Sequence, residues 1–160
     1  MPRRLNAVQL DFVESAPVRL VYSADVGASP SEVYQALADD VEGWPGWFTA
    51  VAWAKPTREG AGRDVGLRGG VRFRETIMAS DPATRYAYRI DETNLPGVRA
   101  MLEEWRLAPA GSGTRVRWTM ALDGPGPLRV GMRLAKPGVG YSFRDAVRRL
   151  ERRLGSAQAG

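Results

Sequence analysis

The stretch SPSEVYQALADDVEGWPGWF, residues 29–48, decides the fold class, because it places a capped helix and an aromatic corner directly after an apolar, β-rich run. Ser29 can cap the helix, Pro30 suits its first turn, and Glu32 can reach back to the cap. Apolar residues then recur at helical spacing, so one stripe of the helix faces a core. These residues are Val33, Ala36, Leu37 and Val41. A short helix is therefore predicted from Ser29 to about Asp40.

The corner that follows reads WPGWF, from Trp44 to Phe48. It is too apolar for a solvated loop and too short for a strand, so it must pack against the rest of the chain. We expect Trp44, Trp47 and Phe48 to be structural lids on the helices rather than ligand contacts.

The composition is that of one folded domain. The chain has 160 residues, of which 44% are hydrophobic and 26% charged, enough for a sizeable core. No apolar run approaches the ~18 residues of a membrane span. The arginines near the start are not followed by an apolar block, so a secretory signal is not expected and the cytoplasm is the simplest location.

Cysteine and histidine are both absent. Their absence excludes disulfides, thiolate and imidazole metal sites, cysteine nucleophiles and histidine triads. Acid–base chemistry would fall to carboxylates, tyrosines, lysines or bound water. The glycine-rich segments match neither a dinucleotide fingerprint nor a phosphate loop with its lysine. We therefore expect no cofactor and no metal.

The formal charge is +5 and the sequence pI about 10.1. The arginines are spread along the chain, with one dense cluster near the end. The cluster comprises Arg144, Arg148, Arg149, Arg152 and Arg153. The simpler interpretation is the solvated face of an amphipathic helix. The alternative is a docking surface for an acidic partner.

The remaining pattern is a series of strands closed by a helix. Alternating apolar residues and turn signals predict strands at 18–25, 51–55, 64–68, 71–79, 85–91, 98–107 and 114–122. Helical signals after residue 127 break at Lys136-Pro137-Gly138, and a last helix is predicted over 142–154. The expected organisation is an N-terminal extension at 1–17, a single domain at 18–154 and a flexible tail at 155–160.

This order resembles the SRPBCC superfamily, the helix-grip fold of START domains, the birch-pollen-allergen group and polyketide cyclases. The resemblance covers roughly residues 18–154. Its motifs are ADVGASPSEVYQALADDVEGWPGWF, VRFRETIMASDPATRYAYRI, LAPAGSGTRVRW and the amphipathic terminus. It implies an α+β fold in which a curved antiparallel sheet of about seven strands, with two short helices after the first, wraps a C-terminal helix and encloses an apolar cavity. Pro137, Gly138 and Gly140 depart from the family's continuous terminal helix, so we expect a break or kink there.

Strand alternation predicts which side chains face such a cavity. In the strand at 71–79, Glu75 falls on the same face as the apolar residues. Glu103 does so in the strand at 98–107. The expected ligand-binding residues are Trp53, Phe73, Ile77, Tyr86, Tyr88, Met101, Trp105, Trp118, Met120 and Phe143. The tryptophans and tyrosines among them can instead be ordinary core residues.

Glu75, Tyr88 and Glu103 are the candidate catalytic residues. Hairpin order places the tyrosine strand between the two glutamate strands, whose backbones would lie about 10 Å apart. A carboxyl buried beside a second carboxyl has a raised pKa and can exchange protons near neutrality. This chemistry suits aldol cyclisation and dehydration, with Glu75 as general acid/base and Tyr88 donating to a ligand carbonyl. Alternatively, Glu75 pairs with an arginine or a tyrosine, and a bulge exchanges Glu103 for Glu104.

Three functions remain open. The cavity pattern favours a carrier for a hydrophobic or aromatic small molecule, lipid- or polyketide-like. The resemblance implies a polyketide cyclase, aromatase or dehydrase, for which Arg144, Arg148, Arg149 and Arg152 could dock an acidic acyl carrier protein. A nucleic-acid-binding protein is suggested by charge alone, and salt-dependent retention on a polyanion would test it. The sequence does not determine the oligomeric state.

Overall fold

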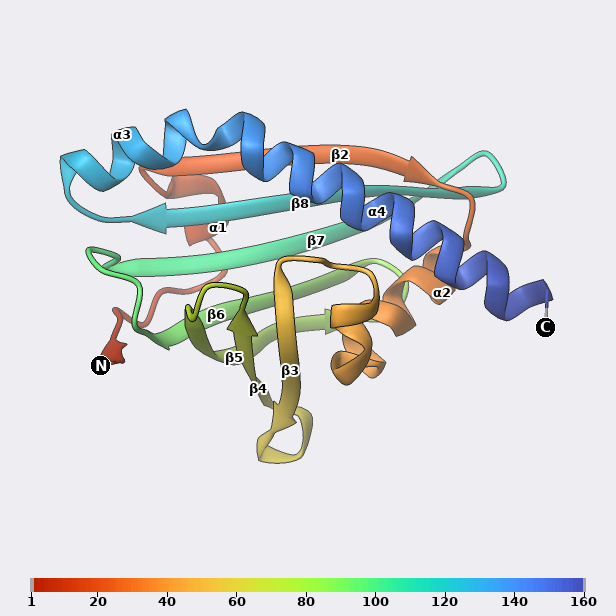
Figure 1. The fold of residues 1–160 in the computed structure, drawn as a ribbon, viewed down its shortest axis with the longest axis horizontal. Helices are drawn as coiled ribbons and strands as arrows, with labels where there is room; N and C mark the ends of the chain where they lie inside the picture. Colours follow the sequence, from red (N-terminus) through yellow and green to blue (C-terminus); the bar gives the residue numbers. More distant parts are fainter. Residues whose placement is uncertain (1, 160) are drawn as a thin grey trace.

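A single curved antiparallel sheet partly encloses one long helix (Figure 1). The computed structural model describes residues 2–159, with side chains described through residue 155. The sheet runs in the order β2-β8-β7-β6-β5-β4-β3, and β1 pairs with β6 at its end. The strands are β1 (Arg3–Arg4), β2 (Val18–Val26), β3 (Val51–Thr57), β4 (Gly62–Leu67), β5 (Arg72–Asp81), β6 (Arg85–Thr93), β7 (Ala100–Ala110) and β8 (Gly113–Asp123). The predicted α+β helix-grip fold is confirmed.

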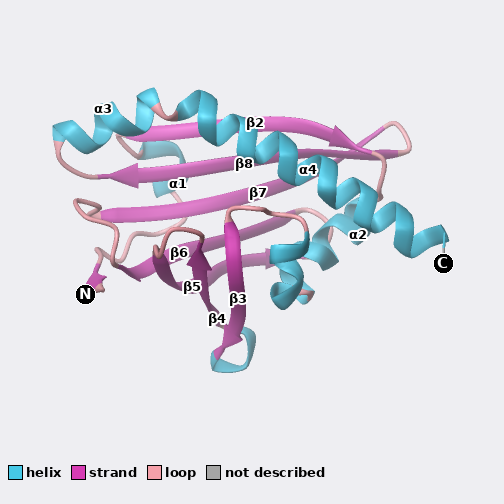
Figure 2. Cartoon of the chain, in the orientation of Figure 1, coloured by secondary structure: helices cyan, strands magenta, loops and turns pink. Residues whose placement is uncertain are grey.

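The helical segments lie along the sheet and at its ends (Figure 2). They are α1 (Phe12–Ser15), α2 (Pro30–Tyr34), the π-helical turn η1 (Gln35–Asp39), the 3-10 turns η2 (Val41–Gly46) and η3 (Arg58–Gly60), α3 (Gly126–Leu134) and α4 (Lys136–Ala159). None of the helices within residues 2–159 combines the length and apolarity that crossing a membrane requires.

The capped helix forms as its sequence predicts. The Ser29 hydroxyl accepts a hydrogen bond from the Glu32 amide at 3.2 Å, and the Glu32 carboxylate accepts one from the Ser29 amide at 3.3 Å. After α2 the helix widens into η1, where the Asp40 amide donates to the Gln35 carbonyl at 2.9 Å. The Trp44 indole then donates to the Leu37 carbonyl at 3.0 Å. This bond ties the aromatic corner back to the helix that precedes it.

The N-terminal residues, expected as an extension with weak signals, pack onto the sheet. Arg3 and Arg4 pair with Thr93 and Glu92 of β6 in the register of β1. The short α1 contacts the convex side of β7 and β8, with Val13 buried. Residues outside 18–154 therefore share the core of the domain. Met1 lies outside the described residues.

The terminal helix differs from the prediction in where it begins. α3 and α4 are separated only by Ala135, and α4 starts at Lys136 rather than Ser142. Pro137 thus falls in the first turn, where its missing N–H leaves no bond unmade. The expected break is therefore present, but it lies at Ala135, one residue before Lys136-Pro137-Gly138. The tail predicted at 155–160 is helical to Ala159, and Gly160 lies outside the described residues.

Gly140 has a packing role in α4. A Cβ added to it would lie 3.0 Å from Cε1 of Tyr22 on β2. The Tyr22 hydroxyl also donates to the Lys136 carbonyl at 2.9 Å. This close approach lets α4 lie along β2, with Phe143, Val147 and Leu150 buried against the concave face of the sheet.

Candidate ligand-binding site

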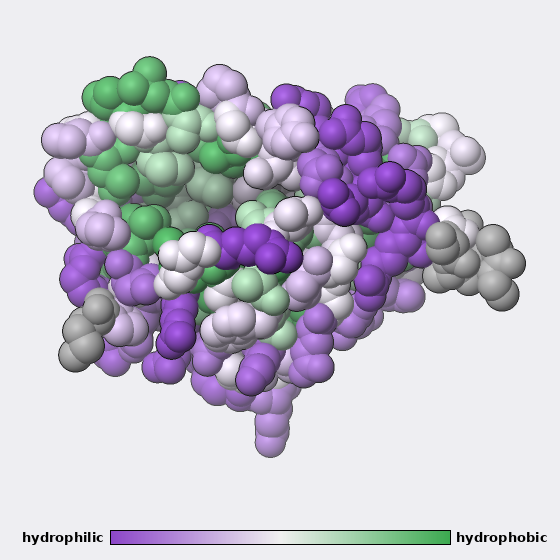
Figure 3. All heavy atoms as spheres, viewed as in Figure 1, coloured by the Kyte–Doolittle hydropathy of each residue, from purple (hydrophilic) through white to green (hydrophobic). Residues whose placement is uncertain are grey.

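A cavity of about 260 Å³ lies between the concave face of the sheet, the aromatic corner and the α3–α4 junction. Its lining is mostly apolar and comes from β4, β5, β6, β7 and β8. Leu67, Leu95, Met132 and Val139 contribute to the lining from the end of β4, the β6–β7 loop, α3 and α4. The surface is hollowed between α3 and the β4–β5 turn (Figure 3).

One wall of this cavity carries a buried ion pair. Arg63 on β4 lies directly across from Glu75 on β5, and the Arg63 Nε donates to the Glu75 carboxylate. The two residues are 2% and 1% exposed. The Arg63 guanidinium also lies 3.9 Å from the ring centroid of Tyr88 and 4.3 Å from that of Trp44. Such cation–π contacts compensate part of the desolvation of the buried charge.

Glu103 is held by a second set of hydrogen bonds on the same wall. Its Oε1 accepts from the Tyr88 hydroxyl at 2.8 Å and from the Trp118 indole at 3.0 Å. The Tyr88 oxygen in turn accepts from the Trp105 indole at 3.2 Å. Because β6 separates β5 from β7, Tyr88 lies between the two glutamates, as predicted. Both its ring and its hydroxyl are therefore engaged by protein groups.

Burial governs the protonation of this cluster. Burial raises the pKa of the Glu75 carboxyl to about 7, although the charge of Arg63 opposes the rise and that of Glu103 adds to it. Burial also raises the pKa of Glu103, against the hydrogen bonds from Tyr88 and Trp118. Two carboxyls facing one guanidinium in an apolar wall disfavour a double negative charge. A proton is therefore retained more readily by both carboxyls than by exposed ones, and Glu75 exchanges its proton near neutral pH.

The structure brings most of the predicted site residues to this cavity. Its lining includes Glu75, Glu103, Phe73, Tyr88, Met101, Trp118 and Met120. Trp105 and Phe143 are buried behind the wall, where both pack against the Trp118 ring. Ile77 and Tyr86 line a separate hollow of about 310 Å³ beside η1.

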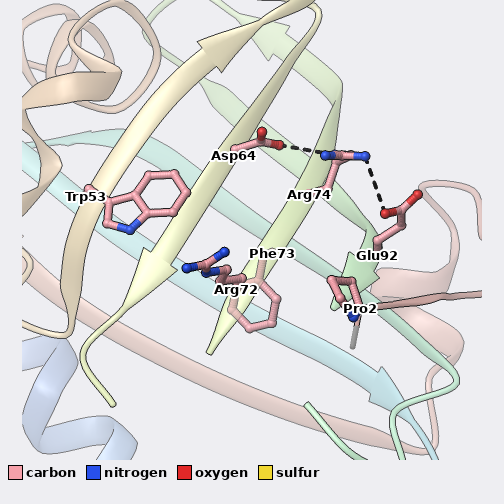
Figure 4. Close-up of a pocket in the computed structure, with 7 residues that line it drawn as sticks. All are labelled: Pro2, Trp53, Asp64, Arg72, Phe73, Arg74 and Glu92. Atoms are coloured by element: carbon pink, nitrogen blue, oxygen red, sulfur yellow. Dashed lines mark hydrogen bonds and ion pairs between the residues drawn. The ribbon is translucent and has the colours of Figure 1, made fainter. Parts of the chain in front are cut away.

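Trp53 was expected in the cavity and lies on the opposite face of the sheet (Figure 4). Val51 pairs with Leu67, but Trp53 pairs with Gly66, so β3 carries an extra residue at this point. This bulge turns Trp53 outward, since a one-residue slip reverses the face of each following side chain. Trp53 is 37% exposed and covers Gly66, where a Cβ would lie 2.2 Å from its indole nitrogen.

Several lining residues were not predicted as such, and three of them have aromatic or charged side chains. Trp44 and Phe48, expected as lids without ligand contact, both face the cavity. Arg63 lay just outside the strand predicted at 64–68, whereas β4 begins at Gly62. Extending the alternation of Val65 and Leu67 back by two residues would have pointed Arg63 inward. The alternative prediction, that Glu75 pairs with an arginine, matches its contact with Arg63.

The arginine cluster of the last helix lies away from this wall. Arg144, Arg148, Arg149 and Arg152 are exposed along α4. Arg149 pairs with Asp145 at 2.8 Å, and Arg153 lies 3.6 Å from Asp40. Among residues 2–159, no cluster of three or more acidic side chains is arranged to hold a metal ion.

Comparison with known sequences gives a consistent assignment. Residues 17–155 match the family model described as polyketide cyclase/dehydrase and lipid transport. Uncharacterised proteins of Mycobacterium tuberculosis and Mycobacterium bovis are 34% identical over 150 residues, which cover 91% of this chain and 89% of theirs.

Solved structures share the fold at lower identity. XoxI from Bacillus cereus superposes with a TM-score of 0.70 at 19% identity, over 88% of this chain and 98% of that one. A START superfamily protein from Mycobacterium smegmatis gives a TM-score of 0.66 at 14% identity, over 87% and 98% of the two chains. The resemblance to the SRPBCC superfamily is confirmed, and the chain belongs to the polyketide cyclase/dehydrase and lipid transport family.

Proposed function

We propose that this protein binds a small hydrophobic molecule that carries a carbonyl or hydroxyl oxygen. The observation that carries the proposal is the polar wall of Arg63, Glu75, Tyr88 and Glu103 in an otherwise apolar cavity. Ligand pockets of this kind bury an apolar body and orient it through a few placed polar groups. Glu103 is the most exposed of the four, at 6%. Its protonated carboxyl would donate to the ligand oxygen.

The cavity volume limits the size of this ligand. A dry cavity of about 150 Å³ accommodates a benzene molecule. At about 260 Å³, this cavity suits one or two rings, or an acyl chain of comparable size. Larger polycyclic molecules would need the mouth at Met132 and Val139 to open.

A tryptophan-quenching titration tests the binding proposal. Trp44 and Trp118 line the cavity, so a bound aromatic ketone should quench their fluorescence in a saturable way. The matched hydrocarbon, which lacks the oxygen, should bind more weakly because it leaves the Glu103 carboxyl without its partner. Equal affinity for the ketone and the hydrocarbon would show that the polar wall does not contribute to recognition. If neither compound quenches the fluorescence, the ligand-binding proposal is rejected.

A second candidate function is a cyclase or dehydratase activity on such a ligand. The specific support is a pair of buried carboxyls whose pKa values are both raised by burial, that of Glu75 to about 7. In a dehydration, the ionised Glu75 would take a proton from the carbon beside a ketone. The protonated Glu103 would give its proton to the leaving hydroxyl, so that a C=C bond forms and water departs. A protein that only carries the ligand needs neither of these two proton transfers.

Turnover separates the two candidates. Glu75→Gln keeps a hydrogen-bonding group of the same shape but cannot accept the proton. If the protein is an enzyme, this variant should lose at least ~100-fold in turnover while ligand quenching persists. If the wild-type protein binds a β-hydroxy ketone but never dehydrates it, the enzymatic function is rejected and the carrier function remains.

A further inference from the structure

The short helix α3 exposes apolar side chains beside the cavity. None of its nine residues is buried. Val130 and Leu134 are 54% and 77% exposed, and Tyr141 in the following turns of α4 is 63% exposed. Figure 3 shows the apolar surface gathered over α3, next to the hollow. Exposed aliphatic groups that gather in this way mark an interaction surface.

The segment that carries these side chains is rich in cationic residues. Residues 124–144 contain no aspartate or glutamate. They contain Arg129, Arg133, Lys136 and Arg144. Of these, Arg129 pairs with Asp123 at 2.9 Å. Lys136 lies between Leu134 and Tyr141 in the chain and is exposed. The strongly hydrophilic surface of α4 continues on the same face of the molecule (Figure 3).

We propose that α3 and the first turns of α4 form a docking surface for an anionic lipid bilayer. Amphipathic helices with aliphatic side chains on one face and arginine or lysine beside them lie in the headgroup layer of such membranes. Val130, Leu134 and Tyr141 enter that layer, while Arg133, Lys136 and Arg144 meet the lipid phosphates. An acidic protein would match the cations but offers no equal reason for the two exposed aliphatic side chains.

The position of this docking surface connects it to the cavity. Met132 of α3 and Val139 of α4 line the cavity, so its lining continues into the docking surface. A ligand that partitions into the bilayer would pass between membrane and cavity without crossing water. This transfer rests on the proposed ligand-binding function, whereas the docking itself does not.

Vesicle co-sedimentation tests the docking. The wild-type protein should bind vesicles of phosphatidylcholine mixed with phosphatidylglycerol, bind phosphatidylcholine alone weakly, and dissociate as salt rises. The double variant V130S/L134S should bind the mixed vesicles at least ~10-fold more weakly, since each side chain contributes apolar burial. The matched control is Val21→Ser, which changes an exposed valine on the convex face of β2. It should bind as the wild type does.

A second pair of variants tests the contribution of the cationic side chains. R133Q/K136Q should weaken binding to the mixed vesicles by ~10-fold or more. Arg117→Gln, on the convex face of β8, should have little effect. The lipid proposal fails if the wild-type protein ignores both kinds of vesicle at low salt, or if V130S/L134S binds as tightly as the wild type. It also fails if α3 proves to mediate a dimer or to capture an acidic acyl carrier protein instead. Quenching titrations without vesicles separate this failure from failure of the ligand-binding function, because the α3 variants leave the polar wall intact.

Discussion

At the scale of single residues, the Arg63–Glu75 pair has the largest consequence. Both side chains are almost completely buried, so neither charge can be left alone without cost. Removing one member of a buried pair costs up to about 3–5 kcal/mol, and the loss of Arg63 also raises the pKa of Glu75 further, so that the carboxyl must take up a proton. Arg63→Met should therefore lower the free energy of unfolding by about that amount, measured by urea denaturation at neutral pH.

The double variant R63M/E75Q tests whether Arg63 and Glu75 stabilise the fold through their interaction or independently. It removes both charges and should recover most of the loss, so that the double-mutant cycle shows strong coupling. Arg115→Met is the matched control, since the Arg115–Asp25 pair at 2.8 Å is exposed and screened by water. Its effect should be close to neutral. Additive losses at Arg63 and Glu75 would show that the two residues act independently.

The protonation of Glu75 predicts a pH dependence of stability. Its pKa rises from 4.5 to about 7 on folding, so between these values the folded state binds more protons than the unfolded state. The free energy of unfolding should therefore fall as pH rises from about 4.5 to 7 and then level off. The contribution is up to about 3 kcal/mol. Urea titrations across this range should show a smaller fall for Glu75→Gln. An identical pH profile in the variant would contradict a raised pKa at this site.

At the scale of elements, local signals in the sequence predicted local structure well. The capping box of Ser29 and Glu32 forms, and the Gly69-Gly70 turn has the positive φ angles that favour glycine. Features that depend on a partner strand were missed. The bulge that turns Trp53 outward follows from pairing with Gly66, and nothing within residues 51–57 marks it. The inward orientation of the Arg63 side chain likewise depends on where β4 begins.

The same limit explains the error at the last helix. Gly138 and Gly140 have low intrinsic helix propensity, so the last helix was predicted to begin only at Ser142. Tertiary packing on Tyr22 outweighs that propensity, because Gly140 allows α4 to approach β2 closely. Helical stability in proteins comes mostly from such packing.

Substitutions at the two glycines test this explanation. Gly138 has no atom within 4 Å of an added Cβ, whereas at Gly140 a Cβ lies 3.0 Å from the Tyr22 ring. Gly138→Ala should raise the free energy of unfolding by up to about 1 kcal/mol through helix propensity. Gly140→Ala should gain less or lose stability, and Gly140→Val should be clearly destabilised. Thermal and urea unfolding of the three variants would show the order, and an equal gain from both alanines would contradict close packing at Gly140.

At the scale of the whole molecule, the closing of α4 over the sheet defines how much ligand the cavity admits. Val139 lines the cavity from the first turns of α4 and is only half-buried, so a larger side chain there has room to project toward the ligand. Val139→Phe should weaken quenching by a two-ring ketone by ~10-fold, equivalent to about 1.4 kcal/mol, and affect a one-ring ketone less. The free energy of unfolding should change by less than about 1 kcal/mol, as the site is not in the packed core.

Val21→Phe provides the control for this prediction, because it adds the same ring to the convex face of β2. It should leave both affinities unchanged. An equal loss for one-ring and two-ring ligands with Val139→Phe would indicate that the ring distorts the polar wall rather than reducing the space. No loss with either ligand would place the entrance elsewhere, and the hollow lined by Ile77 and Tyr86 would be the next site to block. The ligand-size dependence therefore tests whether the volume enclosed by α4 and the sheet, rather than the polar groups alone, selects the ligand.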